Sequence, residues 1–214
     1  MLIGDSHAYQ LLPTFQRMAE SNGWRLITFF KGACPWNTTP LSTPGAFGDA
    51  CTQWRTAVDE RLAKLKADVI FTASLATTPY SSAGYPSAHD AAVAGYRAAW
   101  KPELDRGAKI ITVVDNPVWE TDPNKCLRIR AQSDCTEPRS SGLVADDPVK
   151  AAAEGVPGVT LLDFTDAYCD DTTCFPVVGG ANLYRDQDHL TVTWVNTLQP
   201  WYTAAVKEAL GQAG

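Results

Sequence analysis

The stretch "CTQWRTAVDERLAKLKADVIFTASLA", residues 51–76, contains the pattern that decides the fold. Its first part, 51–67, spaces apolar residues at helical intervals among charged ones, which predicts an amphipathic helix. Its second part, 68–76, is a continuous apolar run, typical of a strand that is buried on both faces of a parallel sheet. A helix that leads directly into such a strand indicates an α/β protein.

The same alternation extends along the rest of the chain. Further strands are predicted at 2–3, 24–30, 108–117 and 159–169. Further helices are predicted at 8–23, 89–107, 148–156 and 191–210, with Pro200 predicting a kink or a restart in the last one. Strands that alternate with helices favour a parallel sheet covered on both faces, so we expect a three-layer α/β/α fold with five parallel strands.

Chemically distinctive segments follow each predicted strand. Because ligands bind outside the carboxyl ends of the strands in such sheets, these segments should meet at one edge and form the site. They are "GDSH" at 4–7, "GACPW" at 32–36, "SLATTPY" at 74–80, "DNPVW" at 115–119 and "DAYC" at 166–169. Long loops are expected at 31–50, 77–88 and 117–147.

Length and charge narrow the function classes. The 214 residues suit one domain, 1–214, with a sizeable core. A formal net charge of −6 argues against a nucleic-acid partner held by counterion release. The longest apolar runs are too short to cross a bilayer, and no signal-peptide pattern precedes the "GDSH" segment.

Six cysteines point to an oxidising compartment. Sequential pairing is the simplest of fifteen possible connectivities, because each pair brackets a loop-like stretch. The pairs would be Cys34–Cys51, Cys126–Cys135 and Cys169–Cys174. Zinc is the alternative, but the tightest spacing has four intervening residues and no nearby histidine. An exported domain without its own signal is expected to be the C-terminal, extracytoplasmic part of a larger membrane protein.

Ser6 is the candidate nucleophile. It lies at a strand-to-helix turn, where its backbone amide is placed to donate to an oxyanion; the alternative is an ordinary N-cap serine. Of the three histidines, His7 is adjacent to Ser6 and not expected to face it, and His89 is expected at an exposed helix start. His189 is the candidate base, because Asp186 three residues earlier can accept from its Nδ1. Asp188, the direct neighbour of His189, is expected to point away.

Two alternatives remain open for these residues. The segment around His189, "RDQDH", is also typical of a solvated polar loop. The nucleophile elbow G-x-S-x-G of other serine esterases is matched only in its first glycine and serine, because Ala8 replaces the last glycine and the motif follows the first strand.

Together, "GDSH" after the first strand and "DQDH" before the last helix resemble the SGNH (GDSL-like) hydrolase superfamily. With "CPW" at 34–36 and "YRDQDHLT" at 184–191, the chain is most similar to SGNH domains fused to bacterial acyltransferase-3 membrane proteins. The resemblance implies a flavodoxin-like α/β/α fold, Ser6 as nucleophile, His189 as base and Asp186 as its orienting carboxylate. It also implies an oxyanion hole from the amide of Ser6 and from Gly32.

One departure from the superfamily pattern concerns the third strand. An asparagine is expected in the loop after it, and the chain has "TASLATTPY" there instead. Ser74, or a backbone amide near Ala76, would have to substitute. Two loop tryptophans, Trp36 and Trp119, are predicted to contact a sugar ring if they are exposed and to anchor their loops if they are buried.

These observations lead to a functional hypothesis. The domain is expected to be an O-acyltransferase, most simply for acetyl groups, that acts on a hydroxyl of a cell-envelope glycan or glycolipid. A membrane acyltransferase part of the same polypeptide would deliver the acyl group, and no metal or cofactor is required. The same residues would serve a carbohydrate O-acetylesterase, and a third possibility is a non-catalytic glycan-binding module with this fold.

Overall fold

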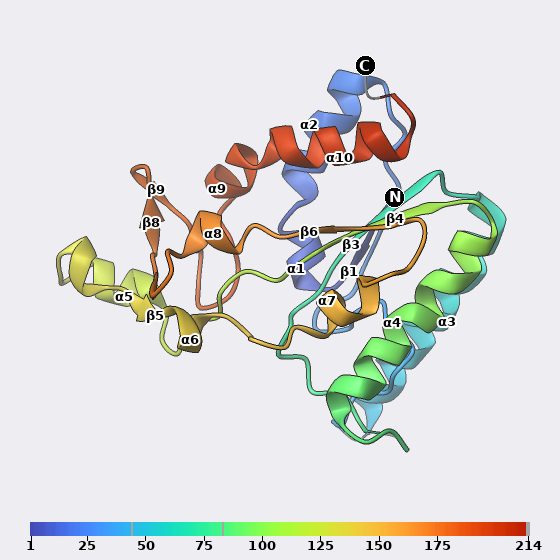
Figure 1. Cartoon of the computed structure of the whole chain (residues 1–214), viewed down its shortest axis with the longest axis horizontal. Coiled ribbons are helices and arrows are strands. Elements are labelled where there is room, and N and C mark those ends of the chain that lie inside the picture. Colours follow the sequence, from blue (N-terminus) through green and yellow to red (C-terminus); the bar gives the residue numbers. More distant parts are fainter. Residues whose placement is uncertain (44, 83, 213–214) are drawn as a thin grey trace.

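The structure is a computed structural model that describes residues 1–43, 45–82 and 84–212 (Figure 1). Positions 44 and 83, which belong to two of the expected loops, and positions 213–214, at the end of the expected domain, lie outside the described residues.

A five-stranded parallel sheet forms the centre of the molecule, as predicted. Its strand order is β2-β1-β3-β4-β6, so the first strand lies between the second and third. The strands are β1 (Leu2–Gly4), β2 (Thr28–Phe30), β3 (Val69–Ala73), β4 (Lys109–Val113) and β6 (Val159–Leu162). All five point the same way, and their carboxyl ends therefore share one edge.

Each strand buries alternate side chains on opposite faces of the sheet. Leu2 and Phe71 belong to one hydrophobic cluster, whereas their neighbours Ile3 and Ile70 belong to the other. This period of two follows from the pleat of the backbone, and it explains why the predicted strands are apolar at successive positions.

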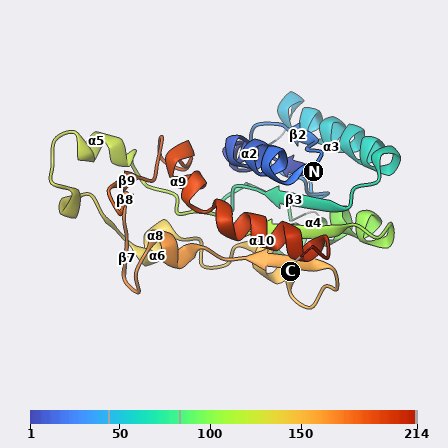
Figure 2. The ribbon, with the colours of Figure 1, turned by 90° about the horizontal axis from the view of Figure 1, so that it is seen from above.

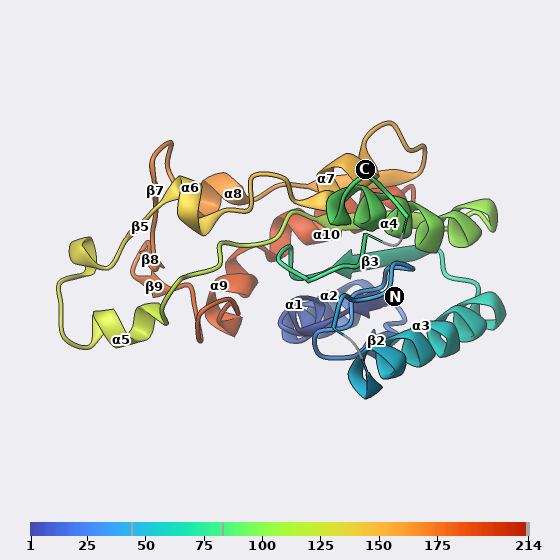
Figure 3. The same ribbon diagram turned by 90° about the horizontal axis from the view of Figure 1, so that it is seen from below.

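Helices cover both faces and complete three layers (Figures 2 and 3). One cluster is closed by α2 (Leu12–Asn22), α9 (Val192–Thr197) and α10 (Gln199–Ala209). The other is closed by α3 (Ala46–Leu65), α4 (Ala88–Asp105) and α7 (Pro148–Ala153). Leu198 separates α9 from α10, and Pro200 stands in the first turn of α10, which confirms the predicted restart.

Several expected elements are shorter or divided, and three of them show the physical reason. The predicted helix at 8–23 consists of α1 (Ser6–Tyr9) and α2, because Pro13 starts the second helix anew. The predicted strand at 24–30 pairs only over β2, since its partner β1 offers three residues. The predicted strand at 159–169 ends at Leu162 and is followed by α8 (Thr165–Tyr168).

A lobe of short elements extends beyond the sheet, at the left of Figure 1. Residues 117–147, which were expected to form a loop, make up the first part of the lobe. They contain α5 (Pro123–Leu127), a 3-10 helix (Gln132–Asp134), β5 (Glu137–Pro138) and α6 (Arg139–Gly142). The later part contains β7 (Thr173–Cys174), β8 (Val177–Val178) and β9 (Ala181–Asn182).

All three predicted disulfides are present. Cys34–Cys51 ties the loop after β2 to α3, whereas Cys126–Cys135 and Cys169–Cys174 close segments of the lobe. Loops of this length contribute roughly 2–3 kcal/mol each when a disulfide closes them. The two disulfides within the lobe therefore restrain segments that consist of short elements.

Candidate active site

Ser6 is the first residue of α1 and lies two residues beyond the end of β1. The N-cap of this helix is Asp5, whose carboxylate accepts the amide of His7 at 2.8 Å. The alternative that Ser6 is an ordinary cap is therefore wrong. Within the described residues, the Ser6 hydroxyl makes no hydrogen bond, including none to His189, and its side chain is half-buried.

Gly4 allows β1 to pass unusually close to β3. Its φ is +151°, and a Cβ at this position would overlap the carbonyl oxygen of Ala73 and lie 2.9 Å from the Cβ of Ala8. Only glycine fits without displacing the backbone. The glycine of the "GDSH" segment thus fixes where the chain turns from the strand into Ser6.

Asp186 holds His189 through both its main chain and its ring. One carboxylate oxygen accepts the backbone amide of His189 at 2.8 Å, and the two oxygens lie 2.9 and 3.0 Å from Nδ1. Burial acts to raise the pKa of Asp186, but the amides of His189 and Asp188 and the imidazole outweigh it and lower the pKa to about 2. Asp186 is thus a carboxylate at neutral pH, and Nδ1 is the nitrogen that it engages.

Asp188 does not point away from His189, contrary to expectation. Its Oδ1 lies 2.8 Å from the same Nδ1 that Asp186 contacts. Burial raises the pKa of Asp188 and outweighs the opposing effect of His189 and His7. The Nε2 atom of His189 is buried and has no hydrogen-bond partner among the described residues.

His7 is a site residue that sequence reasoning set aside. Its side chain is 1% exposed, and its Nδ1 lies 2.6 Å from Oδ1 of Asp115. Burial acts to lower the pKa of His7, but Asp115, Asp5 and Asp188 outweigh burial and raise it to about 9. The sequence did hold one signal for this contact. The "DNP" segment after the fourth strand predicts Asp115 at the carboxyl edge of the sheet, where His7 also lies.

Two amides anchor the segment that carries His189. The side chain of Asn116 donates to the carbonyl of Asp188 at 2.7 Å and accepts from Gln10 at 3.0 Å. Gln10 in turn accepts the backbone amide of Leu190 at 2.6 Å. Because Gln10 follows α1 and Asn116 follows β4, the sheet edge itself positions the histidine.

Carboxylates occupy the backbone amides that follow β3. Asp5 accepts the amide of Leu75 at 3.0 Å, and Asp115 accepts that of Ala76 at 2.8 Å. An oxyanion donor at Ala76 is therefore unavailable, and that expectation is corrected. Ser74 Oγ is buried and makes no hydrogen bond among the described residues.

Ser6 and Gly32 retain backbone amides with no acceptor in the described part of the chain. In the sheet, Gly4 pairs with Phe30, so Ser6 and Gly32 each lie two positions beyond paired strand ends. Gly32 is exposed. This register places the two amides on neighbouring strands at the carboxyl edge, where the oxyanion hole is expected.

Comparison with known proteins identifies the family. Residues 1–203 match the family model described as SGNH domain (fused to AT3 domains). The chain belongs to this SGNH family. No curated protein is similar to it.

Two solved structures share the fold of this SGNH domain. The lipopolysaccharide acetyltransferase periplasmic domain of Salmonella ser. Paratyphi A has 15% sequence identity and a TM-score of 0.69, with 97% of this chain and 82% of that chain covered. A protein assigned as an acylhydrolase from Bacteroides fragilis NCTC 9343 has 13% identity and a TM-score of 0.54, with 97% and 86% covered. At these identities, the likeness shows the α/β/α fold alone.

The two loop tryptophans of the SGNH domain are buried, which corrects the expected sugar contact. Trp36 is fully buried, and its Nε1 donates to Asp59 at 3.1 Å. Trp119 is 4% exposed and packs edge-on against Tyr184, with ring centroids 5.4 Å apart. Both side chains therefore anchor their loops.

His89 lies in the first turn of α4 and is part-exposed, as expected.

One group of side chains has donors close enough for a metal ion. Among the described residues, one donor atom each from His7, Asp188 and His189 lie within 4.8 Å of one another. A carboxylate already engages Nδ1 of each histidine, and the triad chemistry proposed below uses no ion. No helix within the described ranges is long and apolar enough to cross a membrane.

Proposed function

We propose that this SGNH domain transfers an acyl group, most simply acetyl, through Ser6 as nucleophile, His189 as base and Asp186 as orienting carboxylate. The observation that carries the proposal is the pair of contacts between Asp186 and Nδ1 of His189, at 2.9 and 3.0 Å. A carboxylate on Nδ1 fixes the tautomer that leaves Nε2 able to accept a proton.

The placement of Ser6 supports its role. Asp5 performs the capping that a serine at this turn would otherwise provide, so the Ser6 hydroxyl has no structural hydrogen bond among the described residues. Gln10 and Asn116 hold the histidine segment against α1, the helix that begins at Ser6. A hydrogen bond between Ser6 and His189 is expected to form when substrate binds, since such contacts tighten in the reacting complex.

The reaction has two half-steps. Ser6 Oγ attacks the carbonyl carbon of the donor ester while His189 takes the hydroxyl proton, and the donor alcohol then leaves with that proton. An acceptor hydroxyl next gives its proton to His189 and attacks the acyl-serine. The new ester departs, and Ser6 regains its proton. The negative oxygen of each tetrahedral intermediate would accept from the amides of Ser6 and Gly32.

The acceptor class and cellular location are part of the proposal. Three disulfides favour an oxidising compartment, which supports an extracytoplasmic domain. Membership of a family fused to AT3 domains supports a membrane acyltransferase in the same polypeptide as the acyl source. The accessible acceptor would then be a hydroxyl of a cell-envelope glycan or glycolipid, as with the lipopolysaccharide named for the Salmonella domain.

The first experiment tests the triad. Hydrolysis of p-nitrophenyl acetate is measured for the wild type, Ser6→Ala and His189→Gln, with Ser21→Ala and His89→Gln as matched surface controls. We expect the two site variants to lose at least ~10³-fold in kcat/KM and the controls to match the wild type. Equal release by Ser6→Ala and the wild type would remove the triad and favour a glycan-binding module.

The second experiment separates transfer from hydrolysis. The protein is acylated with p-nitrophenyl acetate, and a chito-oligosaccharide or trehalose is supplied as acceptor. Mass spectrometry should find an acetyl group first on the Ser6 peptide and then on the oligosaccharide. Release of acetate to water at the same rate with and without any acceptor would instead identify a carbohydrate O-acetylesterase.

A further inference from the structure

A second histidine lies beside the proposed base and has no part in the reaction described above. The ring centroids of His7 and His189 are 5.1 Å apart. His7 engages Asp115 through Nδ1 at 2.6 Å, whereas its buried Nε2 has no hydrogen-bond partner in the described part of the chain. A fully buried imidazole with one nitrogen unpartnered requires a reason, because buried polar groups are normally satisfied.

The surroundings of His189 suggest that reason. Its Nδ1 meets a carboxylate oxygen of Asp186 at 2.9 Å and one of Asp188 at 2.8 Å, although it can donate only one proton. The second carboxylate adds a negative charge that a triad does not need. His7 is the second imidazole beside Asp188 after His189 itself, since one donor atom each from His7, Asp188 and His189 lie within 4.8 Å of one another.

The charges that face His7 come from three elements. Asp5 caps α1, Asp115 follows β4, and Asp188 precedes α9; all three act to raise the pKa of His7, to about 9, against the effect of burial. Asp147, which accepts the backbone amide of Asp115 at 3.0 Å, is the next carboxylate outward. On the His189 side, Arg185 lies 3.4 Å from Asp186. His7 is therefore a cation at neutral pH.

We propose that His7 is a positioning residue of the acyl-transfer site. Its imidazolium, held by Asp115, offsets the negative charge that Asp188 adds beside Nδ1 of His189. This inference rests on the proposed role of His189 as the base. It accounts for the histidine of "GDSH", which the triad leaves without a task.

The pH profile of kcat/KM for p-nitrophenyl acetate tests the inference in four proteins: wild type, His7→Gln, Asp188→Asn and the double variant. On the acidic side of the profile, the midpoint is the pH at which kcat/KM reaches half of its maximum. His7→Gln removes a positive charge beside His189 and should raise this midpoint by about one pH unit. Asp188→Asn removes a negative charge and should lower it by a similar amount. The double variant should return close to the wild-type midpoint. His89→Gln, which removes a part-exposed histidine, should leave the profile unchanged.

A second readout does not depend on activity. Nitrogen NMR of the imidazoles in Ser6→Ala protein should show His7 carrying protons on both ring nitrogens at pH 7, and Asp115→Asn should lower the pH at which one is lost. A neutral His7 at pH 7, or an unmoved midpoint in a folded His7→Gln variant, overturns the inference. If His7→Gln does not fold, an unmoved midpoint in Asp188→Asn overturns it equally. Retained activity in Ser6→Ala would instead overturn the proposed function, while the NMR result still reports on His7.

Discussion

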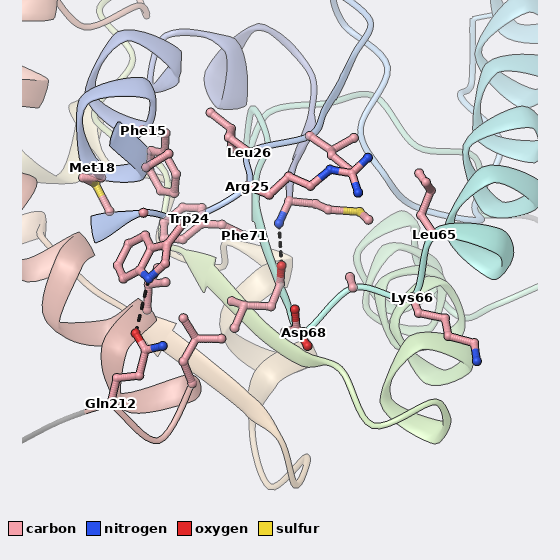
Figure 4. Close-up of a pocket in the computed structure, with 18 residues that line it drawn as sticks. Phe15, Met18, Trp24, Arg25, Leu26, Leu65, Lys66, Asp68, Phe71 and Gln212 are labelled. Atoms are coloured by element: carbon pink, nitrogen blue, oxygen red, sulfur yellow. Dashed lines mark hydrogen bonds between the residues drawn. The ribbon is translucent and has the colours of Figure 1, made fainter. Parts of the chain in front are cut away.

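The two edges of the sheet bury different chemistry. The amino edge is the edge at which the five strands begin, and it holds a cavity of about 380 Å³ (Figure 4). The cavity is lined by Trp24, Leu26 and residues of α2, α10 and β3. Within it, Nε1 of Trp24 donates to Gln212 at 3.2 Å. At the carboxyl edge, the buried groups are carboxylates, amides and imidazoles. Neither Ser6 nor His189 lines the amino-edge cavity.

This difference teaches where to look for function in the fold. The cavity mixes apolar side chains with the charged Arg25, Lys66 and Asp68, and a hollow of this kind can arise from imperfect packing. Charges are buried only when partners satisfy them, and Asp5 and Asp115 each accept backbone amides as well as acting on His7. The buried carboxylates and imidazoles that surround Ser6 mark the carboxyl edge as the candidate site, whereas the buried Glu103 of α4 is simply paired with Arg106.

The largest expected contrast is catalytic. Asp186→Asn should lower kcat/KM for p-nitrophenyl acetate by about 10³–10⁴-fold, because the amide cannot hold the tautomer of His189 that accepts a proton. Asp68→Asn, at the amino edge, should leave kcat/KM unchanged. Because the carboxylate of Asp186 accepts two backbone amides and the imidazole, its variant should also melt at a somewhat lower temperature, so kcat/KM is compared where both variants are fully folded. Comparable activity in both variants would break the contrast between the edges.

The next contrast compares two glycines. Gly4→Ala should lower the free energy of unfolding by about 3–5 kcal/mol, since the new Cβ meets the Ala73 carbonyl and the protein must shift backbone to admit it. Gly23→Ala, at the amino edge, places its Cβ in open space at a φ of +67° and should lose only about 1 kcal/mol. Urea unfolding measures both, and equal losses would show that β1 tolerates displacement.

A pH effect on stability should follow from His7. Its pKa is about 9 in the folded protein against 6.5 when exposed, so its contribution is complete below pH 6.5 and is lost as the pH rises through 9. The free energy of unfolding should fall by about 2–3 kcal/mol over this window. Urea unfolding at pH 6.5, 7.5 and 9 measures the fall, and His7→Gln should flatten it. An equally steep fall in His7→Gln would assign the effect to another group.

The smallest effect is expected at the amino-edge cavity. Leu26 is half-buried there and packs against the hydrophobic core. Leu26→Ala should lower the free energy of unfolding by about 1–2 kcal/mol, below the usual cost of a fully buried leucine, because the site is already partly open. Esterase activity at saturating substrate should not change. A loss of activity without a loss of stability would connect the cavity to the site.

The sequence predicts what depends on local spacing. The five strands and most helices follow from periods of two and about 3.6 residues, which each segment displays by itself. The same holds for Asp186 and His189, since they are three positions apart and lie within one turn of each other. The three disulfides could also be predicted, because each joins two cysteines that follow one another in the order of the cysteines along the chain.

What the sequence does not reveal depends on contacts between distant segments. His7 and Asp115 meet only because β1 and β4 flank β3 in the sheet. The burial of Trp36 and Trp119 depends on which elements cover their loops, and loop position alone left exposure and burial both open. Asp188 turns toward His189 because Asn116 holds its carbonyl, a contact across 72 positions.

The hydrogen bond between Gln10 and Leu190 spans 180 positions of the chain and joins its first helix to the segment that carries the base. Within this domain, Ser6 is synthesised before the segment that carries His189. Contacts of such long sequence separation form slowly, because the intervening loop must close before they can stabilise anything. Under the proposed function, Ser6 would therefore lack its base until the segment that carries His189 has folded against Gln10.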